Sequence, residues 1–186
     1  MSKIGIEYAV FAPATQGASA ITYDNGFHVG PIAVYNSTVS AANGKDYGDD
    51  HVVATVNDVT GGTITIEFNH ENDDIKTKIL GHTKDTQSSE ISYKGSDVAP
   101  YLGTGFVGKS REGNVNVYRA KWYALVQFKE PNDDNSTKGE NVTFGHVSVE
   151  GDIIIPDGDL EWKKEKSFDT LAAAKAWLNE LADISA

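Results

Sequence analysis

A strict alternation of apolar and polar residues runs through residues 61–69, GGTITIEFN, and constrains the fold more than any other feature. In an extended chain, successive side chains point to opposite sides, so the apolar and polar residues separate onto two faces. The apolar face holds Ile64, Ile66 and Phe68, and the polar face holds Thr63, Thr65 and Glu67. The pattern predicts a β-strand with one face in a core.

Residues 141–156, NVTFGHVSVEGDIIIP, repeat the pattern. The apolar side holds Val147, Val149 and Ile153, and the polar side holds His146, Ser148, Glu150 and Asp152. Pro156 ends this second predicted strand, because proline cannot donate to a ladder of hydrogen bonds.

A longer run, residues 114–131, carries large side chains on both predicted faces. One face would hold Tyr118, Ala120, Trp122, Ala124, Val126 and Phe128. The other would hold Arg119, Lys121, Tyr123, Gln127 and Lys129, together with Val117 and Leu125. This two-sided pattern predicts that the second face also meets another part of the protein.

Further strands are predicted from the remaining apolar runs, at Ile4 to Phe11, Pro31 to Ala41, Val52 to Val56 and Val98 to Val107. Gly103 and Gly105 predict a bend or bulge in the last of these.

Two helices are predicted. Near residue 75, acids precede lysines and Gly81 follows, which is the order that the helix dipole and a C-cap favour; its apolar stripe is Ile75, Ile79 and Leu80. The second helix covers residues 168–182, with Asp169 as the predicted N-cap and Phe168 as a hydrophobic staple. Its apolar side holds Leu171, Ala174, Trp177, Leu178 and Leu181.

These elements predict one mainly β (α+β) domain over residues 1–186, with a short flanking helix and a C-terminal helix. The formal charge of −11 argues against non-specific attraction to nucleic acid or anionic membranes. The chain has no cysteine, which excludes thiol catalysis and disulfides. It has neither a signal-peptide pattern nor an apolar run of about 18 residues, so we expect a soluble protein that stays cytoplasmic when made.

The acidic stretch GKDYGDDHVV places Asp46, Asp49, Asp50 and His51 close together. A divalent cation is one interpretation, but the spacing lacks the ligand order of a calcium loop, and a solvated turn or an interaction surface remains. His70, Glu71 and His82 do not form a zinc motif. Because no acid, base or nucleophile motif is assembled, we expect no enzyme activity, no metal and no cofactor.

The blocks KILGHTKD, SDVAPYLGTGFVG and YRAKWYALVQFKEPNDDNSTKGENVTFGHVSVEGDI, in this order, resemble the major tail protein (tail tube protein) family of long-tailed, non-contractile bacteriophages. KIGIEYAVFAP, DYGDDHVV and AAAKAWLNE also fit, so the resemblance covers nearly the whole chain. It implies a β-sandwich or barrel flanked by a helix, assembling as rings, usually hexameric, that stack into a hollow tube.

The resemblance further implies that the tube belongs to the virion and is assembled in the cytoplasm of the bacterial host. Its partners would be other copies of itself, the tape measure protein, the tail terminator and the distal tail or baseplate proteins. DNA would pass through the lumen without specific binding, and no membrane would be involved. An acidic lumen suits this role, because basic residues would form ion contacts that must break as DNA leaves.

Two sets of residues are candidates for roles in such a tube. The alternation favours Thr63, Thr65, Glu67, Ser148, Glu150 and Asp152 as lumen-facing residues, although the same polar faces could simply meet water outside. The loop residues Asp46, Asp49, Asp50 and His51 are candidates for contacts between subunits. Arg119 and Lys121 could pair with the candidate lumen acids or with a neighbouring subunit.

Two other functions remain open. The same fold would serve the tube of a contractile or secretion-type injection device. A non-catalytic β-sandwich that binds carbohydrate would instead stack sugars on Trp122, Tyr123 and Tyr101.

Overall fold

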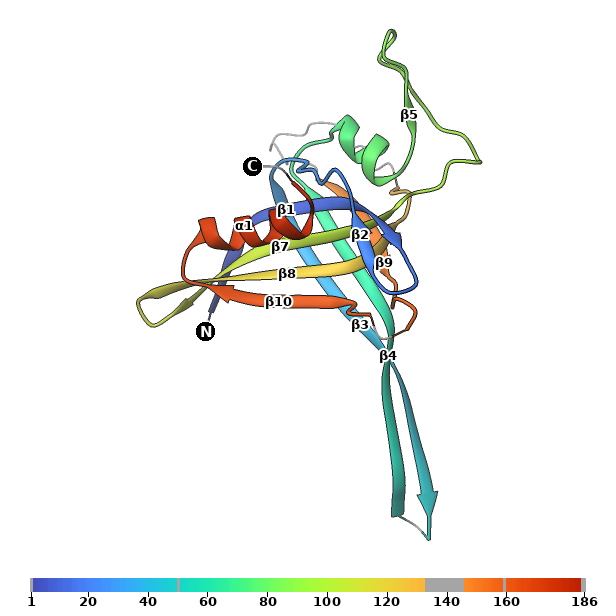
Figure 1. Ribbon diagram of the computed structural model, residues 1–186, viewed down its shortest axis with the longest axis vertical. Coiled ribbons are helices and arrows are strands. Elements are labelled where there is room, and N and C mark those ends of the chain that lie inside the picture. Colours follow the sequence, from blue (N-terminus) through green and yellow to red (C-terminus); the bar gives the residue numbers. More distant parts are fainter. Residues whose placement is uncertain (1, 50, 133–145, 159, 185–186) are drawn as a thin grey trace, which may run out of the picture.

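The fold is that of a computed structural model, which describes residues 2–49, 51–132, 146–158 and 160–184. The described part is mainly β and antiparallel, with a short C-terminal helix (Figure 1). The strands are β1 (Ser2–Gln16), β2 (Ile21–Tyr23), β3 (Ile32–Gly48), β4 (His51–Phe68), β5 (Thr83–Lys84), β6 (Ile91–Ser92), β7 (Tyr101–Glu112), β8 (Val115–Phe128), β9 (Val147–Ile153) and β10 (Lys163–Phe168). A π-helical segment covers Ile75–Ile79, and helix α1 covers Leu171–Leu181.

The main sheet forks at β8. Its strand order is β2-β1-β7-β8-β9-β4-β3, and β10 also pairs with β8. The edge of β8 away from β7 is shared: β10 pairs with Tyr118 to Tyr123, and β9 pairs with Val126 to Phe128. The sheet therefore divides into a β10 branch and a β9–β4–β3 branch.

The two faces of the central strands lie in different apolar cores. One core collects buried side chains from the β9–β4–β3 branch, from β1, β7 and β8, and from the π-helical segment; it includes Phe11, Ile66, Ile79 and Tyr123. The other lies between α1 and strands β1, β7 and β8, and includes Val10, Trp122 and Leu178. Burial of β8 on both faces confirms the prediction made from its two-sided pattern.

The predicted single apolar face of β8 is wrong, because its alternation changes sides part-way along. Ala120 and Trp122 face the α1 core, whereas Val126 and Phe128 belong to the other core. The register shifts between Leu102 and Thr104 of the neighbouring β7, where β8 carries an extra residue. Such a bulge reverses the side to which every later residue points. It lies where the glycine-rich pattern predicted a bend.

Gly103 sits opposite this bulge. A Cβ atom added there would lie 2.4 Å from both Trp122 Cζ2 and Tyr23 Cε1, so no larger residue fits without a shift. The glycine is required by this close approach of two aromatic rings.

β3 and β4 form one long hairpin that projects from the body of the protein (Figure 1). The predicted strands Pro31 to Ala41 and Val52 to Val56 were too short. The acidic stretch that holds Asp46 and His51, expected to be a loop, is largely strand, because β3 continues to Gly48 and β4 begins at His51. The alternation predicted for residues 61–69 is confirmed, with Ile64, Ile66 and Phe68 buried.

The helical predictions hold in part. Ile75, Ile79 and Leu80 are buried as predicted, and Gly81 adopts a positive φ of 83° beyond them, but the segment is a single π-type turn. Helix α1 begins later than predicted, because residues up to Phe168 belong to β10. Its N-cap is Thr170 rather than Asp169: the Thr170 hydroxyl accepts a hydrogen bond from Ala173 N. Neither helix in the described ranges is long and apolar enough to cross a membrane.

Candidate assembly surface

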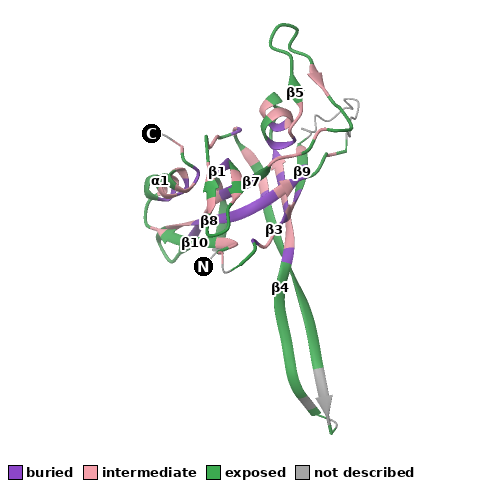
Figure 2. Cartoon of the chain, turned by 45° about the vertical axis from the view of Figure 1, so that its right-hand side comes forward, coloured by how far each residue is buried: buried purple, intermediate pink, exposed green. Residues whose placement is uncertain are grey.

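The outer part of the β3–β4 hairpin has no core on either face. Figure 2 shows its described residues exposed along both strands. Val53 is 62% exposed and Val56 is 51% exposed, although valine normally occurs in strands that pack on something. A two-stranded hairpin without a third strand or a covering layer is only marginally stable in water. This segment is therefore a candidate surface for contact with another chain.

The hairpin also leaves a strand edge open. β3 is the last strand in the sheet order, so its outer edge has no partner strand among the described residues. An unpaired edge presents a row of N–H and C=O groups that can pair with another chain. The register shifts between Ser40 and Ala41 and between Asp46 and Tyr47 twist this edge without closing it.

The candidate inter-subunit residues lie at the tip of this hairpin. Asp49 is exposed, occupies the turn and has a positive φ of 48°, a conformation that aspartate tolerates better than most residues. His51 Nδ1 lies 2.9 Å from the Asp49 carbonyl oxygen and helps to hold the turn. Asp46 pairs with Ala54 in the ladder, and Asp50 lies outside the described residues. The structure thus places Asp46, Asp49 and His51 at one end of the molecule.

The six candidate lumen-facing residues form one polar face across β4 and β9. The register pairs Thr63 with Asp152, Thr65 with Glu150 and Glu67 with Ser148. Directly opposed residues of an antiparallel pair lie on the same face of the sheet. The alternation correctly predicted that the three residues of β4 share one face and that the three residues of β9 share one face. The register shows in addition that these two faces are continuous.

Lys129 and His146 were not predicted as ion-pair partners of this face. Lys129, just beyond the end of β8, lies 2.8 Å from Asp152 and 3.6 Å from Glu150. The hydrogen bond to Asp152 raises the pKa of Lys129 against the opposing effect of burial, and the charges of Asp152 and Glu150 raise it further. His146 Nδ1 lies 3.5 Å from Glu67 Oε2. Lys129 therefore partly neutralises the acids of the face.

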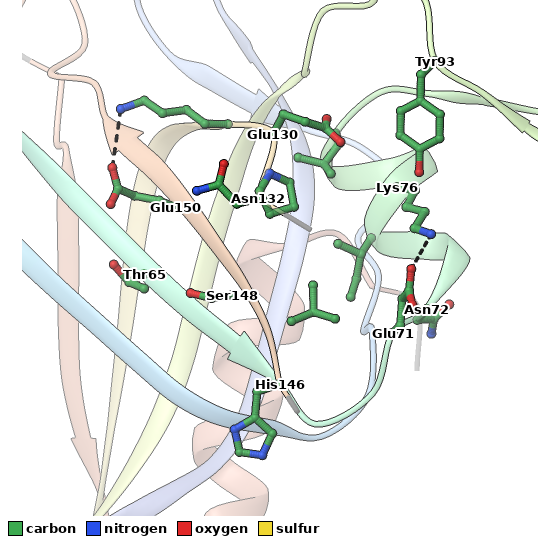
Figure 3. Close-up of a pocket in the computed structure, with 15 residues that line it drawn as sticks. Thr65, Glu71, Asn72, Lys76, Tyr93, Glu130, Asn132, His146, Ser148 and Glu150 are labelled. Atoms are coloured by element: carbon green, nitrogen blue, oxygen red, sulfur yellow. Dashed lines mark ion pairs between the residues drawn. The ribbon is translucent and has the colours of Figure 1, made fainter. Parts of the chain in front are cut away.

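A cavity of about 710 Å³ separates the polar face from the π-helical segment. Figure 3 shows Thr65, Ser148 and Glu150 on one side of it and Lys76 and Tyr93 on the other. Two ion pairs lie in the lining of the cavity, Lys129 with Glu150 and Lys76 with Glu71. These four charged side chains are thus paired with one another.

Arg119 and Lys121 lie on β8 where it pairs with β10, and among the described residues both are placed beside an acid of β10. Arg119 Nε is 3.2 Å and Lys121 Nζ is 3.7 Å from the carboxylate of Glu165. Lys163 Nζ is also 3.7 Å from Glu165. Glu165 and Lys163 were missed in the sequence, where KKEKS over residues 163–167 places one acid among three lysines.

His82 joins three segments of the chain. Its side chain is buried, and its two ring nitrogens lie 3.0 Å from Asp97 Oδ2 and 2.7 Å from Glu130 Oε2. The Tyr93 ring lies against it at a tilt of 50°, with the ring centres 4.2 Å apart. Two carboxylates on one imidazole require both ring nitrogens to donate, which only the protonated ring can do. Burial opposes that charge, but the two carboxylates outweigh it and raise the pKa of His82.

A pH dependence of stability follows from His82. A histidine with a raised folded-state pKa stabilises the fold fully below its unfolded pKa of about 6.5 and loses this contribution as pH rises through the folded value. We expect the melting temperature to fall over this window in the native chain. The His82→Gln variant should show a flatter profile in thermal unfolding followed by circular dichroism. Parallel profiles for the two proteins would contradict the assignment.

The alternatives to an assembly surface receive no support from these positions. No group of three or more His, Asp or Glu that could hold a metal ion occurs within the described ranges. His82 is engaged with two carboxylates and Glu71 with Lys76, so the zinc set considered above is not assembled. Trp122 and Tyr123 are buried, at 1% and 0% exposure, and cannot stack on a sugar; Tyr101 is exposed.

Comparison with known proteins adds no family: no family model matches the chain, and no curated protein matches it.

Proposed function

We propose that this protein is a structural virion subunit that assembles as stacked rings, hexameric by resemblance, to form the hollow tail tube of a long-tailed phage. The observation that carries the proposal is the β3–β4 hairpin, which extends beyond the core with exposed valines on β4 and an open edge on β3. A hairpin of this kind is stabilised when neighbouring copies cover it.

Closure of strands from several copies into one barrel would remove the open edge of β3. Barrels abolish edges that otherwise invite uncontrolled pairing. The sequence resemblance to tail tube proteins supports this arrangement, as does the mainly β, antiparallel fold. In this proposal the bent sheet of each subunit is the sandwich or barrel of the tail tube type. The same geometry would serve a contractile or secretion-type tube.

The polar face of β4 and β9 is the proposed lumen surface. Its residues Glu67, Glu150 and Asp152 outnumber Lys129, the lysine that reaches the face from the described part of the chain, so the described face keeps an acidic balance. DNA phosphates would then slide past without accumulating ion pairs. Substituting both Glu150 and Asp152 with Lys should leave rings intact and slow DNA ejection from virions that carry the variant. Unchanged ejection kinetics would remove this face from the lumen.

Electron microscopy of the purified chain tests the proposed function. Negative-stain images should show rings or tubes, and their abundance should rise with protein concentration. Because tube proteins can wait for a nucleating complex, the chain should also be imaged after incubation at high concentration and with tail-tip fractions. Featureless small particles under all of these conditions would contradict the proposal.

A further inference from the structure

His82 lies at the base of an arm that projects from the body of the protein (Figure 1). We call residues 82–97, which contain the short strands β5 and β6, the arm. Its two ends are joined by the contact of His82 Nδ1 with Asp97 Oδ2 at 3.0 Å. The other ring nitrogen, Nε2, lies 2.7 Å from Oε2 of Glu130, which follows the end of β8. One imidazole thus closes the arm on itself and fastens it to the sheet.

The two carboxylates that contact His82 are held differently. The side chain of Asp97 is 13% exposed and accepts a second hydrogen bond, from Lys94 N at 2.9 Å. The side chain of Glu130 is 54% exposed, and within the described ranges His82 is its sole hydrogen-bond or ion-pair partner. Water can therefore replace the imidazole at Glu130, whereas Asp97 would lose a donor in a nearly dry place, which costs more free energy.

A neutral imidazole carries one N–H group, so it can donate to only one of these two carboxylates. The proton stays on Nδ1, because Asp97 is the more deeply buried acceptor. Nε2 then presents a lone pair to the carboxylate of Glu130, and two acceptors at hydrogen-bond distance repel each other. Loss of one proton therefore breaks the contact of His82 with Glu130 and keeps the contact with Asp97.

The other charged groups around His82 do not take over its role. The titratable side chains near it are Tyr93, Lys94 and Asp97 on the arm, Lys76 in the π-helical segment, and Lys129 and Glu130 beyond β8. Lys76 is paired with Glu71, and Lys129 with Asp152. Burial lowers the pKa of His82, but the hydrogen bonds to the two carboxylates raise it above its ordinary value. The contact with Glu130 is therefore complete below about pH 6.5 and is lost at higher pH.

The broken contact frees the segment that follows Lys129. Lys129 itself stays on the sheet, because its N–H donates to the Glu150 carbonyl oxygen at 2.7 Å. The arm stays on the π-helical segment, because Lys84 Nζ lies 2.8 Å from Asp73 Oδ2. The arm and residues 130–132 both line the cavity of about 710 Å³ (Figure 3). Their separation would widen the cavity on that side.

We propose that His82 is a pH-sensitive latch: its charged form fastens the arm to the segment after β8, and its neutral form releases Glu130 and opens one wall of the cavity. Protonation of a histidine between two packed segments is an established way to shift a protein between two arrangements. The latch goes beyond the proposed function and does not depend on it.

Nitrogen-15 NMR of the histidine side chains tests the protonation step. At about pH 5.5 both ring nitrogens of His82 should carry protons, and at about pH 9 the ring should be the Nδ1–H tautomer. Loss of the signal in His82→Gln assigns it. The side-chain carboxyl carbon of Glu130 should shift with the same midpoint. A neutral ring protonated on Nε2, or a ring that does not titrate over this range, would overturn the proposal.

Amide hydrogen exchange followed by mass spectrometry tests the opening. After correction for the intrinsic pH dependence of exchange, peptides that contain residues 93–97 and 129–132 should lose protection at about pH 9, whereas the interior of β7 should not. Glu130→Gln should remove this response, because a glutamine amide can donate to bare Nε2 and can accept from protonated Nε2. The matched control is Glu90→Gln, which makes the same change on an exposed acid of the arm and should respond like the native chain.

Glu130→Ala completes the set. Because this variant lacks the carboxylate of the latch, the same peptides should exchange fast at both pH values. Equal responses to pH in the native chain and in Glu130→Gln would show that the latch is wrong, and so would full protection of the native peptides at about pH 9. Neither readout uses assembly, so a latch that fails leaves the proposed tube function standing, and a chain that forms no tubes leaves the latch standing.

Discussion

Shortening the β3–β4 hairpin should abolish tube assembly and leave the monomer folded. The variant replaces residues 43–57 with Asn-Gly, so that the paired residues Ala42 and Asp58 flank a two-residue turn, which Asn-Gly favours in its type I′ form. The described side chains that are removed are exposed, so little buried apolar surface is lost. The melting temperature should therefore stay within a few degrees of the native value.

The measurements are negative-stain microscopy for assembly and thermal unfolding for the monomer. A full-length chain carrying Asn57→Ser serves as the control, because it keeps the hairpin length and should assemble normally. Tubes from the shortened chain would remove the hairpin from the assembly surface. A large loss of monomer stability would instead show that the hairpin supports the core.

Replacing Trp122 with Ala should destabilise the monomer by about 3–5 kcal/mol, the usual range for removing a large buried aromatic side chain. Trp122 is 1% exposed, lies edge-on to Tyr23 at 5.1 Å and donates from Nε1 to the Tyr23 hydroxyl at 3.3 Å. It also lies in the core that holds α1 against the sheet. Its removal should loosen the helix as well as leave a cavity.

Urea unfolding followed by circular dichroism measures this loss. Trp122→Phe keeps much of the ring volume and should lose clearly less than the alanine variant. A loss below about 1 kcal/mol for Trp122→Ala would mean that the site collapses around the missing ring, and that the helix does not depend on it.

The sequence predicted those parts of the fold in which one face of a strand is buried. Ile64, Ile66 and Phe68 alternate with threonines and Glu67, which predicts a core on one side of the strand. In the structure these three apolar side chains are buried. The outer hairpin, VSAANGKDYG, was assigned partly to a loop because neither of its faces is buried, so no alternation marks it. Its strand geometry comes from pairing with β4, which a local pattern cannot show.

For the candidate site too, the sequence predicted only which residues share a face of a strand, because only that is marked by local alternation. Thr65 and Glu150 were placed on polar faces because their neighbours are apolar, but their pairing depends on the register between distant strands. The bulge in β8 could not be predicted from the alternation either. Because of it, Val126 and Phe128 lie in a different core from Trp122. Glu165 as the shared partner of Arg119 and Lys121 also required the pairing of β10 with β8.

The fork in the sheet at β8 gives the molecule two mechanical branches. A pull on the hairpin would pass as shear through the ladders of β4 and β9 into the end of β8 near Val126 to Phe128. The β10 ladder and helix α1 join β8 and its neighbours on the other branch, outside that line of force. We therefore expect a tube under tension to yield first along β9, while the C-terminal segment stays docked.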